Sequence, residues 1–147
     1  TNMSNITIFP PALTMQSKRM KDVQFTLEAV SQAHTDLSKL CAVVCSSRAK
    51  SADTLNELIR IQRNIDSVCE GLDSYTDDSG FYEIYTECDL ASSFLTCVIL
   101  TIWGKDQPPI TAQQPLEWRD AMVTYGVMFS TMHRLSNALQ AIKAVIV

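Results

Sequence analysis

The chain has 147 residues, of which 46% are hydrophobic and 19% are charged, and its formal net charge is −4. This length fits one domain, and the hydrophobic content excludes a disordered protein. The acidic balance gives no general attraction to nucleic acid, so we expect no nucleic-acid partner.

The first fourteen residues differ in composition from the rest of the chain. They combine Ser, Asn, Thr and Ile with the pair Pro10-Pro11, and consecutive prolines favour an extended backbone. We therefore predict an extended or flexible arm over residues 1–14, followed by one helical domain over residues 15–147. In composition alone, residues 3–14 resemble the export signals of bacterial type III secreted proteins.

Hydrophobic residues then recur at spacings of three and four, which is the periodicity of amphipathic helices. Glycine and proline are scarce within these stretches. Helices are predicted over residues 15–47, 55–75, 81–103 and 115–147. Because short connections make consecutive helices antiparallel, the predicted fold is all-α, an antiparallel (up-down-up-down) four-helix bundle with long heptad-like helices.

The same spacing predicts which residues form the core. In the first helix the predicted seam is Met20, Val23, Leu27, Val30, His34, Leu37, Cys41 and Val44. Thr54 and Glu57 have the spacing of a capping box at the start of the second helix. In the fourth helix the predicted seam is Trp118, Ala121, Tyr125, Met128, Met132, Leu135, Leu139, Ile142 and Ile146.

Residues 94–103 form an almost wholly apolar run, rich in β-branched side chains. Composition alone also fits a buried strand. Helix is preferred because no other segment of the sequence predicts a partner strand. The run is too short to cross a bilayer, so we expect no transmembrane segment.

Five cysteines occur within the predicted helices, and their odd number disfavours a fully paired disulfide framework. We interpret them as small buried residues in a reducing, cytoplasmic compartment. The alternative is a secreted chain with two disulfides and one free thiol. The residues are Cys41, Cys45, Cys69, Cys88 and Cys97.

Residue patterns for catalysis or metal binding are absent from the sequence. Neither His34 nor His133 follows a glutamate by three residues, which excludes the di-iron helical bundles. Cys41 and Cys45 are the only closely spaced pair of thiols, and a zinc site would need two further ligands. We predict no catalytic residue, no metal, no cofactor and no enzymatic activity.

The charge distribution is the most individual feature of the sequence. Lys and Arg are absent between Asn64 and Gly104, where eight acidic residues occur. These residues form either a solvated acidic end or a docking surface for a basic partner. Met122 and Phe129, with Phe25, fall off the predicted seams and are candidates for an exposed apolar patch. The candidate partner surface comprises Asp73, Asp77, Asp78, Glu83, Glu87, Met122 and Phe129.

These patterns favour a non-enzymatic protein–protein interaction module, such as an adaptor, a scaffold or a chaperone-like bundle. Its partner would be another protein, and its long seams also suit self-association as a homodimer. The alternative is a secreted helical factor, either a bacterial secretion-system effector or translocator-type protein or a cytokine-like bundle.

Overall fold

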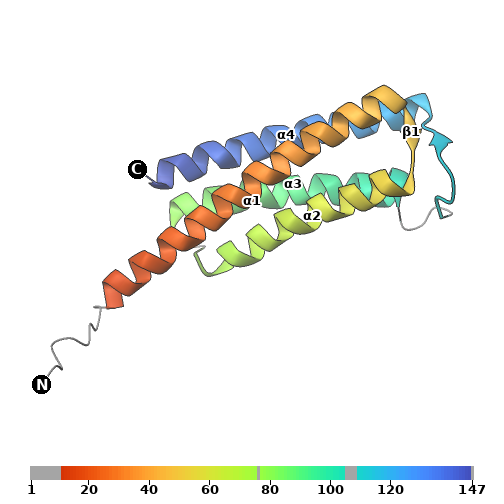
Figure 1. Cartoon of the computed structure of the whole chain (residues 1–147). Helices are drawn as coiled ribbons and strands as arrows, with labels where there is room; N and C mark the ends of the chain where they lie inside the picture. Colours follow the sequence, from red (N-terminus) through yellow and green to blue (C-terminus); the bar gives the residue numbers. More distant parts are fainter. Residues whose placement is uncertain (1–10, 76, 105–108, 147) are drawn as a thin grey trace, which may run out of the picture.

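The computed structural model describes residues 11–75, 77–104 and 109–146, with side chains from Ser17 onward. Each helix packs against the next one along the chain, and α1 packs against α4 to close the bundle (Figure 1). The predicted all-α, up-down four-helix bundle is therefore confirmed. The helices are α1 (Pro11–Ser47), α2 (Ala52–Leu72), α3 (Ser79–Val98) and α4 (Trp118–Ile146).

Helix α1 begins at Pro11, four residues before the predicted start at residue 15. Proline suits the first turn of a helix, because the backbone N–H that it lacks would have no partner within the helix there. The first turns of α1 project beyond the other helices (Figure 1). Residues 1–10 of the predicted arm lie outside the described residues.

The start of α2 differs from the prediction. Ser51 is the N-cap residue, and its hydroxyl accepts a hydrogen bond of 3.1 Å from the backbone N–H of Thr54. The capping box predicted at Thr54 and Glu57 is therefore wrong by one turn. With Ser51 as its N-cap, α2 begins at Ala52, three residues earlier than predicted.

The apolar run 94–103 is helical, as predicted. Helix α3 continues directly into the π-helix η3 (Ile99–Trp103), which stops at Gly104. A Cβ at Gly104 would lie 1.8 Å from the carbonyl oxygen of Ile99, so only glycine fits there. The continuous helix Ser79–Trp103 is long and apolar enough to cross a membrane by length and composition. A core helix meets the same criterion, and 44% of its most apolar window is buried.

A two-residue antiparallel strand pair joins the α1–α2 connection to the segment before α4. Strand β1 (Ala49–Lys50) pairs with β2 (Gln114–Pro115), and this pairing was not predicted. It delays the start of α4 to Trp118, because Pro115 lies in β2 instead of starting the helix. The Lys50 ammonium donates a 2.8 Å hydrogen bond to the Ile102 carbonyl in the π-helix.

The core uses a seam of α4 that is shifted around the helix from the predicted one. The buried residues of α4 are Ala121, Thr124, Met128, Thr131, Leu135, Ala138, Ala141 and Ile142. Trp118 and Ile146, both predicted in the seam, are exposed, and Tyr125, Met132 and Leu139 are only partly buried. The same shift affects α1, where Thr26 and Ala33 are buried while Met20 is exposed.

The buried threonines explain this shift, because their side chains are short and their hydroxyls are satisfied. Thr124 and Thr131 each donate a 2.7 Å hydrogen bond to the carbonyl four residues earlier in α4. Thr124 also accepts a 3.1 Å hydrogen bond from the indole N–H of the fully buried Trp103. A hydropathy pattern scores threonine as polar and so assigns these positions to the surface.

We predict that Thr124→Val lowers the free energy of unfolding by about 1–3 kcal/mol, because the buried indole N–H of Trp103 would lose its acceptor. Thr131→Val is the matched control, since its hydroxyl bonds only within its own helix. Chemical denaturation followed by tryptophan fluorescence measures both changes. Equal losses in the two variants would contradict a specific role for the Trp103–Thr124 bond.

Candidate functional site

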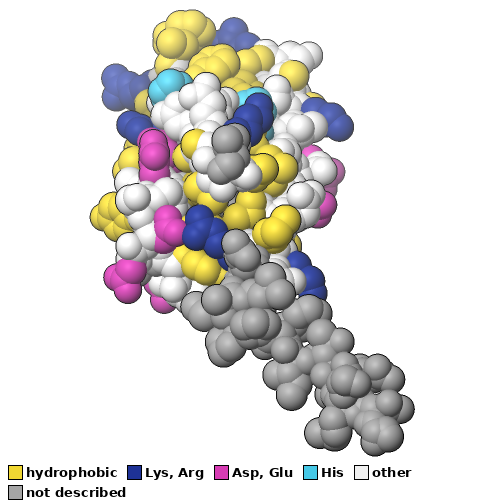
Figure 2. Space-filling view, turned by 90° about the vertical axis from the view of Figure 1, so that its left-hand side faces the viewer, with side chains coloured by type: hydrophobic (Ala, Val, Ile, Leu, Met, Phe, Trp, Pro, Cys, Tyr) yellow, Lys and Arg dark blue, Asp and Glu magenta, His cyan; other side chains and the backbone are white. Residues whose placement is uncertain are grey.

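The predicted partner surface divides into two regions of the bundle. Asp73, Asp77 and Asp78 lie at the turn between α2 and α3, where η2 (Asp73–Tyr75) ends the second helix. Met122 and Phe129 lie on α4, which is diagonally opposite α2 (Figure 1). In the end view of Figure 2, acidic side chains lie along the two flanks, while a group of hydrophobic side chains stands at the upper edge. The seven residues therefore do not form one surface.

Asp78 is bound within the bundle on both carboxylate oxygens. One oxygen caps α3 by accepting from the backbone N–H groups of Gly80 at 3.0 Å and Phe81 at 3.4 Å. The other accepts a 2.7 Å hydrogen bond from the Arg19 guanidinium of α1. These contacts, above all that with Arg19, hold the pKa of Asp78 below its ordinary value. Asp78 is thus part of the scaffold.

Aromatic packing completes this end of the bundle. The rings of Tyr75 and Phe81 stack with centroids 4.5 Å apart, and the Arg19 guanidinium lies 4.6 Å from the Phe81 centroid. The Tyr75 hydroxyl donates a 2.5 Å hydrogen bond to the carboxylate of Asp22. That bond to an anion raises the pKa of Tyr75 to about 12. Helix α1 is thereby tied to the α2–α3 turn.

The two glutamates of α3 differ in their surroundings. Glu83 is exposed, whereas Glu87 faces α4 and pairs with Arg134 at 3.3 Å. Of the five predicted acidic residues, Asp73, Asp77 and Glu83 are exposed to solvent. Only these three are available to a partner without breaking a contact that joins two helices.

An acidic groove between α2 and α3 was not predicted as a unit. It has a volume of about 340 Å³ and is lined by Asp66, Cys69, Glu70, Asp73 and Tyr85. Burial, followed by the nearby carboxylates of Asp89 and Asp66, raises the pKa of Cys69 to about 12. Helical spacing would have found the groove, because Asp66 and Asp73 are seven residues apart, which places both on one face of a helix.

A polar cluster lies beside this groove and shares Asp66 with it. The hydroxyl of the buried Ser92 donates to the carboxylate of Asp66, and the amide of Gln62 donates to both. These bonds join α2 to α3. No group of three or more His, Cys, Asp or Glu side chains able to hold a metal ion occurs within the described parts of the chain.

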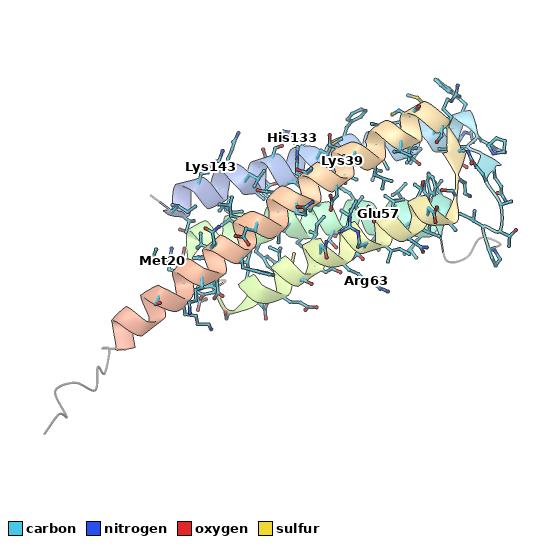
Figure 3. The ribbon with its side chains drawn as sticks, viewed as in Figure 1. Met20, Lys39, Glu57, Arg63, His133 and Lys143 are labelled. Carbon is cyan, nitrogen blue, oxygen red and sulfur yellow. The ribbon has the colours of Figure 1, made fainter. Side chains whose placement is uncertain are left out.

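The outer face of α4 carries several large apolar side chains. Met122 is 49% exposed and Phe129 is 59% exposed, in keeping with their predicted place off the seam. Trp118, 65% exposed, and Val123, 47% exposed, extend the face. The Arg48 guanidinium lies over the Trp118 ring at 5.3 Å. His133 and Lys143, on the same helix, point away from the bundle (Figure 3).

Phe25 is exposed but belongs to a different part of the surface. His34 Nε2 lies 3.2 Å from Ser136 Oγ, which places these two residues at the same level of antiparallel α1 and α4. Phe129, seven residues before Ser136, is then level with Cys41. Phe25 lies sixteen residues before Cys41 on α1, roughly 24 Å along the helix. It does not extend the α4 face.

The five cysteines are all free. Cys41, Cys69 and Cys88 are buried, as expected, but Cys45 and Cys97 are exposed. Cys41 and Cys45 have sulfur atoms 4.0 Å apart, and burial is the main cause that raises the pKa of Cys41 to about 11.

Comparisons of the chain with protein-family models, with curated proteins and with solved structures gave no match.

We predict that Asp78→Ala lowers the free energy of unfolding at neutral pH by about 1–2 kcal/mol, chiefly through loss of the helix cap. The part-exposed ion pair with Arg19 adds little to that loss. Asp77→Ala, at the exposed neighbour, should change the free energy by less than about 0.5 kcal/mol. Urea denaturation measures both.

The Asp78 effect should also depend on pH. Because the folded-state pKa is lowered, the stabilisation is present above the ordinary value of 3.8 and is lost as the pH falls through the folded-state pKa. The difference between Asp78→Ala and the unsubstituted chain should therefore shrink below about pH 4. A difference that stays constant down to pH 2 would contradict a role for the ionised carboxylate.

We predict that a thiol reagent labels Cys45 and Cys97 rapidly in the folded chain and labels the three buried cysteines only after unfolding. Burial hinders access and, by raising the pKa, lowers the fraction of reactive thiolate. Titration under denaturing, non-reducing conditions should then count five thiols. A count of one would instead indicate two disulfides.

Proposed function

We propose that this protein is a non-enzymatic protein–protein interaction module that binds its partner through the outer face of α4. The observation that supports this most directly is the clustering of Trp118, Met122 and Phe129 on one exposed helix face. Single exposed apolar residues are common and need no explanation. Several on one face of one helix indicate an interface.

The energetics favour covering this face. Burying apolar surface stabilises a complex by about 25 cal/mol per Å², and aromatic side chains contribute most to interface energies. Trp118 and Phe129 are both more than half exposed, so each retains most of its area for a partner. An amphipathic helix laid along α4 is the simplest element that would cover them.

The acidic end is proposed as a second, electrostatic contact. Asp73, Asp77 and Glu83 are exposed, and the region lacks Lys and Arg from residue 65 to residue 103. Such a patch affects the rate of association with a basic partner more than the final affinity. Its contribution should therefore fall as the salt concentration rises.

The test is capture by crosslinking from the native source, with the unsubstituted chain and three variants. Phe129→Glu should abolish capture of partners of the α4 face, while Phe25→Glu, a similarly exposed phenylalanine elsewhere, should leave it intact. Asp73→Lys combined with Asp77→Lys should slow association at low salt. This design spares Asp78 and Glu87, whose substitution would weaken the bundle itself.

Circular dichroism must show the same helix content in every variant. If Phe129→Glu and the double lysine variant both capture the same proteins as the unsubstituted chain, in equal amounts, the proposed surfaces are wrong.

A further inference from the structure

We propose that Cys41 and Cys45 together bind a soft metal ion that accepts two thiolate ligands, of which Cu(I) is the example. This site is independent of the proposed function. Three features of the pair support it: the distance between the two sulfur atoms, the helix that carries both residues, and their unequal exposure.

The two thiols already lie at a distance that one ion can bridge. Cys41 and Cys45 are about one helical turn apart on the same face of α1, and their sulfur atoms are 4.0 Å apart. A zinc–thiolate bond is about 2.3 Å long, so two bonds of that length through one ion span up to roughly 4.6 Å. An ion between the sulfur atoms therefore reaches both without any movement of the backbone.

The same helix keeps the pair from closing a disulfide. Residues four positions apart on a helix have Cβ atoms about 5–6 Å apart, whereas a disulfide needs a Cβ separation of about 3.5–4.5 Å. Helix α1 continues through both cysteines and ends at Ser47. The sulfur atoms therefore cannot bond to each other unless the end of the helix unwinds, and both thiols stay available to an ion.

The unequal exposure of the two thiols gives an ion a route to the pair. Cys45 is exposed, whereas Cys41 is 5% exposed. Burial raises the pKa of Cys41 to about 11, so this thiol is protonated at neutral pH until an ion binds. Each sulfur loses its proton to solvent as its bond to the ion forms. Two S–H bonds are replaced by two sulfur–metal bonds, and no electron is transferred.

The ligand set selects the kind of ion. Thiolates favour soft ions such as Cu(I) over Mg²⁺ or Ca²⁺, which prefer oxygen ligands. Among the residues that the structure describes, no third His, Cys, Asp or Glu completes a metal-binding group with Cys41 and Cys45. Structural zinc would therefore lack half of its four ligands, whereas a two-coordinate ion needs no further ligand.

Anaerobic titration of the full chain with Cu(I), in competition with the coloured chelator bathocuproine disulfonate, tests the site. The unsubstituted chain should bind one Cu(I) at this pair. Cys45→Ser leaves a single thiol there and should weaken binding by roughly a hundredfold or more, because the second bond no longer forms within the same molecule. Cys97→Ser removes the other exposed cysteine and is the matched control, which should leave the affinity unchanged.

A second variant and a second measurement complete the test. Cys41→Ala should lose affinity as Cys45→Ser does, and circular dichroism should show unchanged helix content in all variants. Sedimentation velocity should show that the Cu(I)-loaded chain is no larger than the ion-free chain. Equal affinity of Cys45→Ser and the unsubstituted chain overturns the proposal. A Cu(I)-dependent dimer that disappears in Cys97→Ser overturns it as well, because the ion would then join two chains through a different cysteine.

Discussion

The orientation of α4 in the bundle depends on short side chains that enter the core beside large ones. Thr124, Thr131 and Ala138 are buried in α4, at core positions that in most helical bundles carry larger apolar side chains. Because the threonine hydroxyls bond to carbonyls of their own helix, they enter the core without leaving an unsatisfied polar group. Because this face of α4 packs into the core, Trp118, Met122 and Phe129 lie on the opposite face of the helix and are exposed to solvent. The core packing and the exposed apolar face are therefore two results of one helix orientation.

Much of the fold follows from the spacing of apolar residues, because four long periodic segments with short connections permit few arrangements. The helix orientation was harder to predict. For α4 the apolar residues cover two adjacent stripes, and the sequence-based seam mixed positions from both, such as Ala121 and Trp118. A hydropathy scale counts threonine as polar, although its hydroxyl can be hydrogen-bonded within its own helix. The same scale counts Trp118 as apolar, although its ring can stay at the surface beside the guanidinium of Arg48.

The candidate site was predictable only in part, for a related reason. Exposure of Met122 and Phe129 follows from their angle on α4, which is a local property. The binding of Asp78 by Arg19 depends on two residues 59 positions apart, which local spacing cannot bring together. The strand pair β1–β2 and the contact of Lys50 with Ile102 are likewise non-local. The sequence alone therefore does not separate the carboxylates that bind other helices, such as Asp78, from those that are exposed to solvent, such as Asp77.

The absence of Lys and Arg from residues 65 to 103 has a consequence for solubility. The exposed Asp73, Asp77 and Glu83 concentrate negative charge at the end of the bundle where α2 turns into α3. Two copies that meet through these ends would repel each other within a Debye length of about 10 Å at moderate salt. This charge asymmetry would thus limit end-to-end growth into fibres or precipitates.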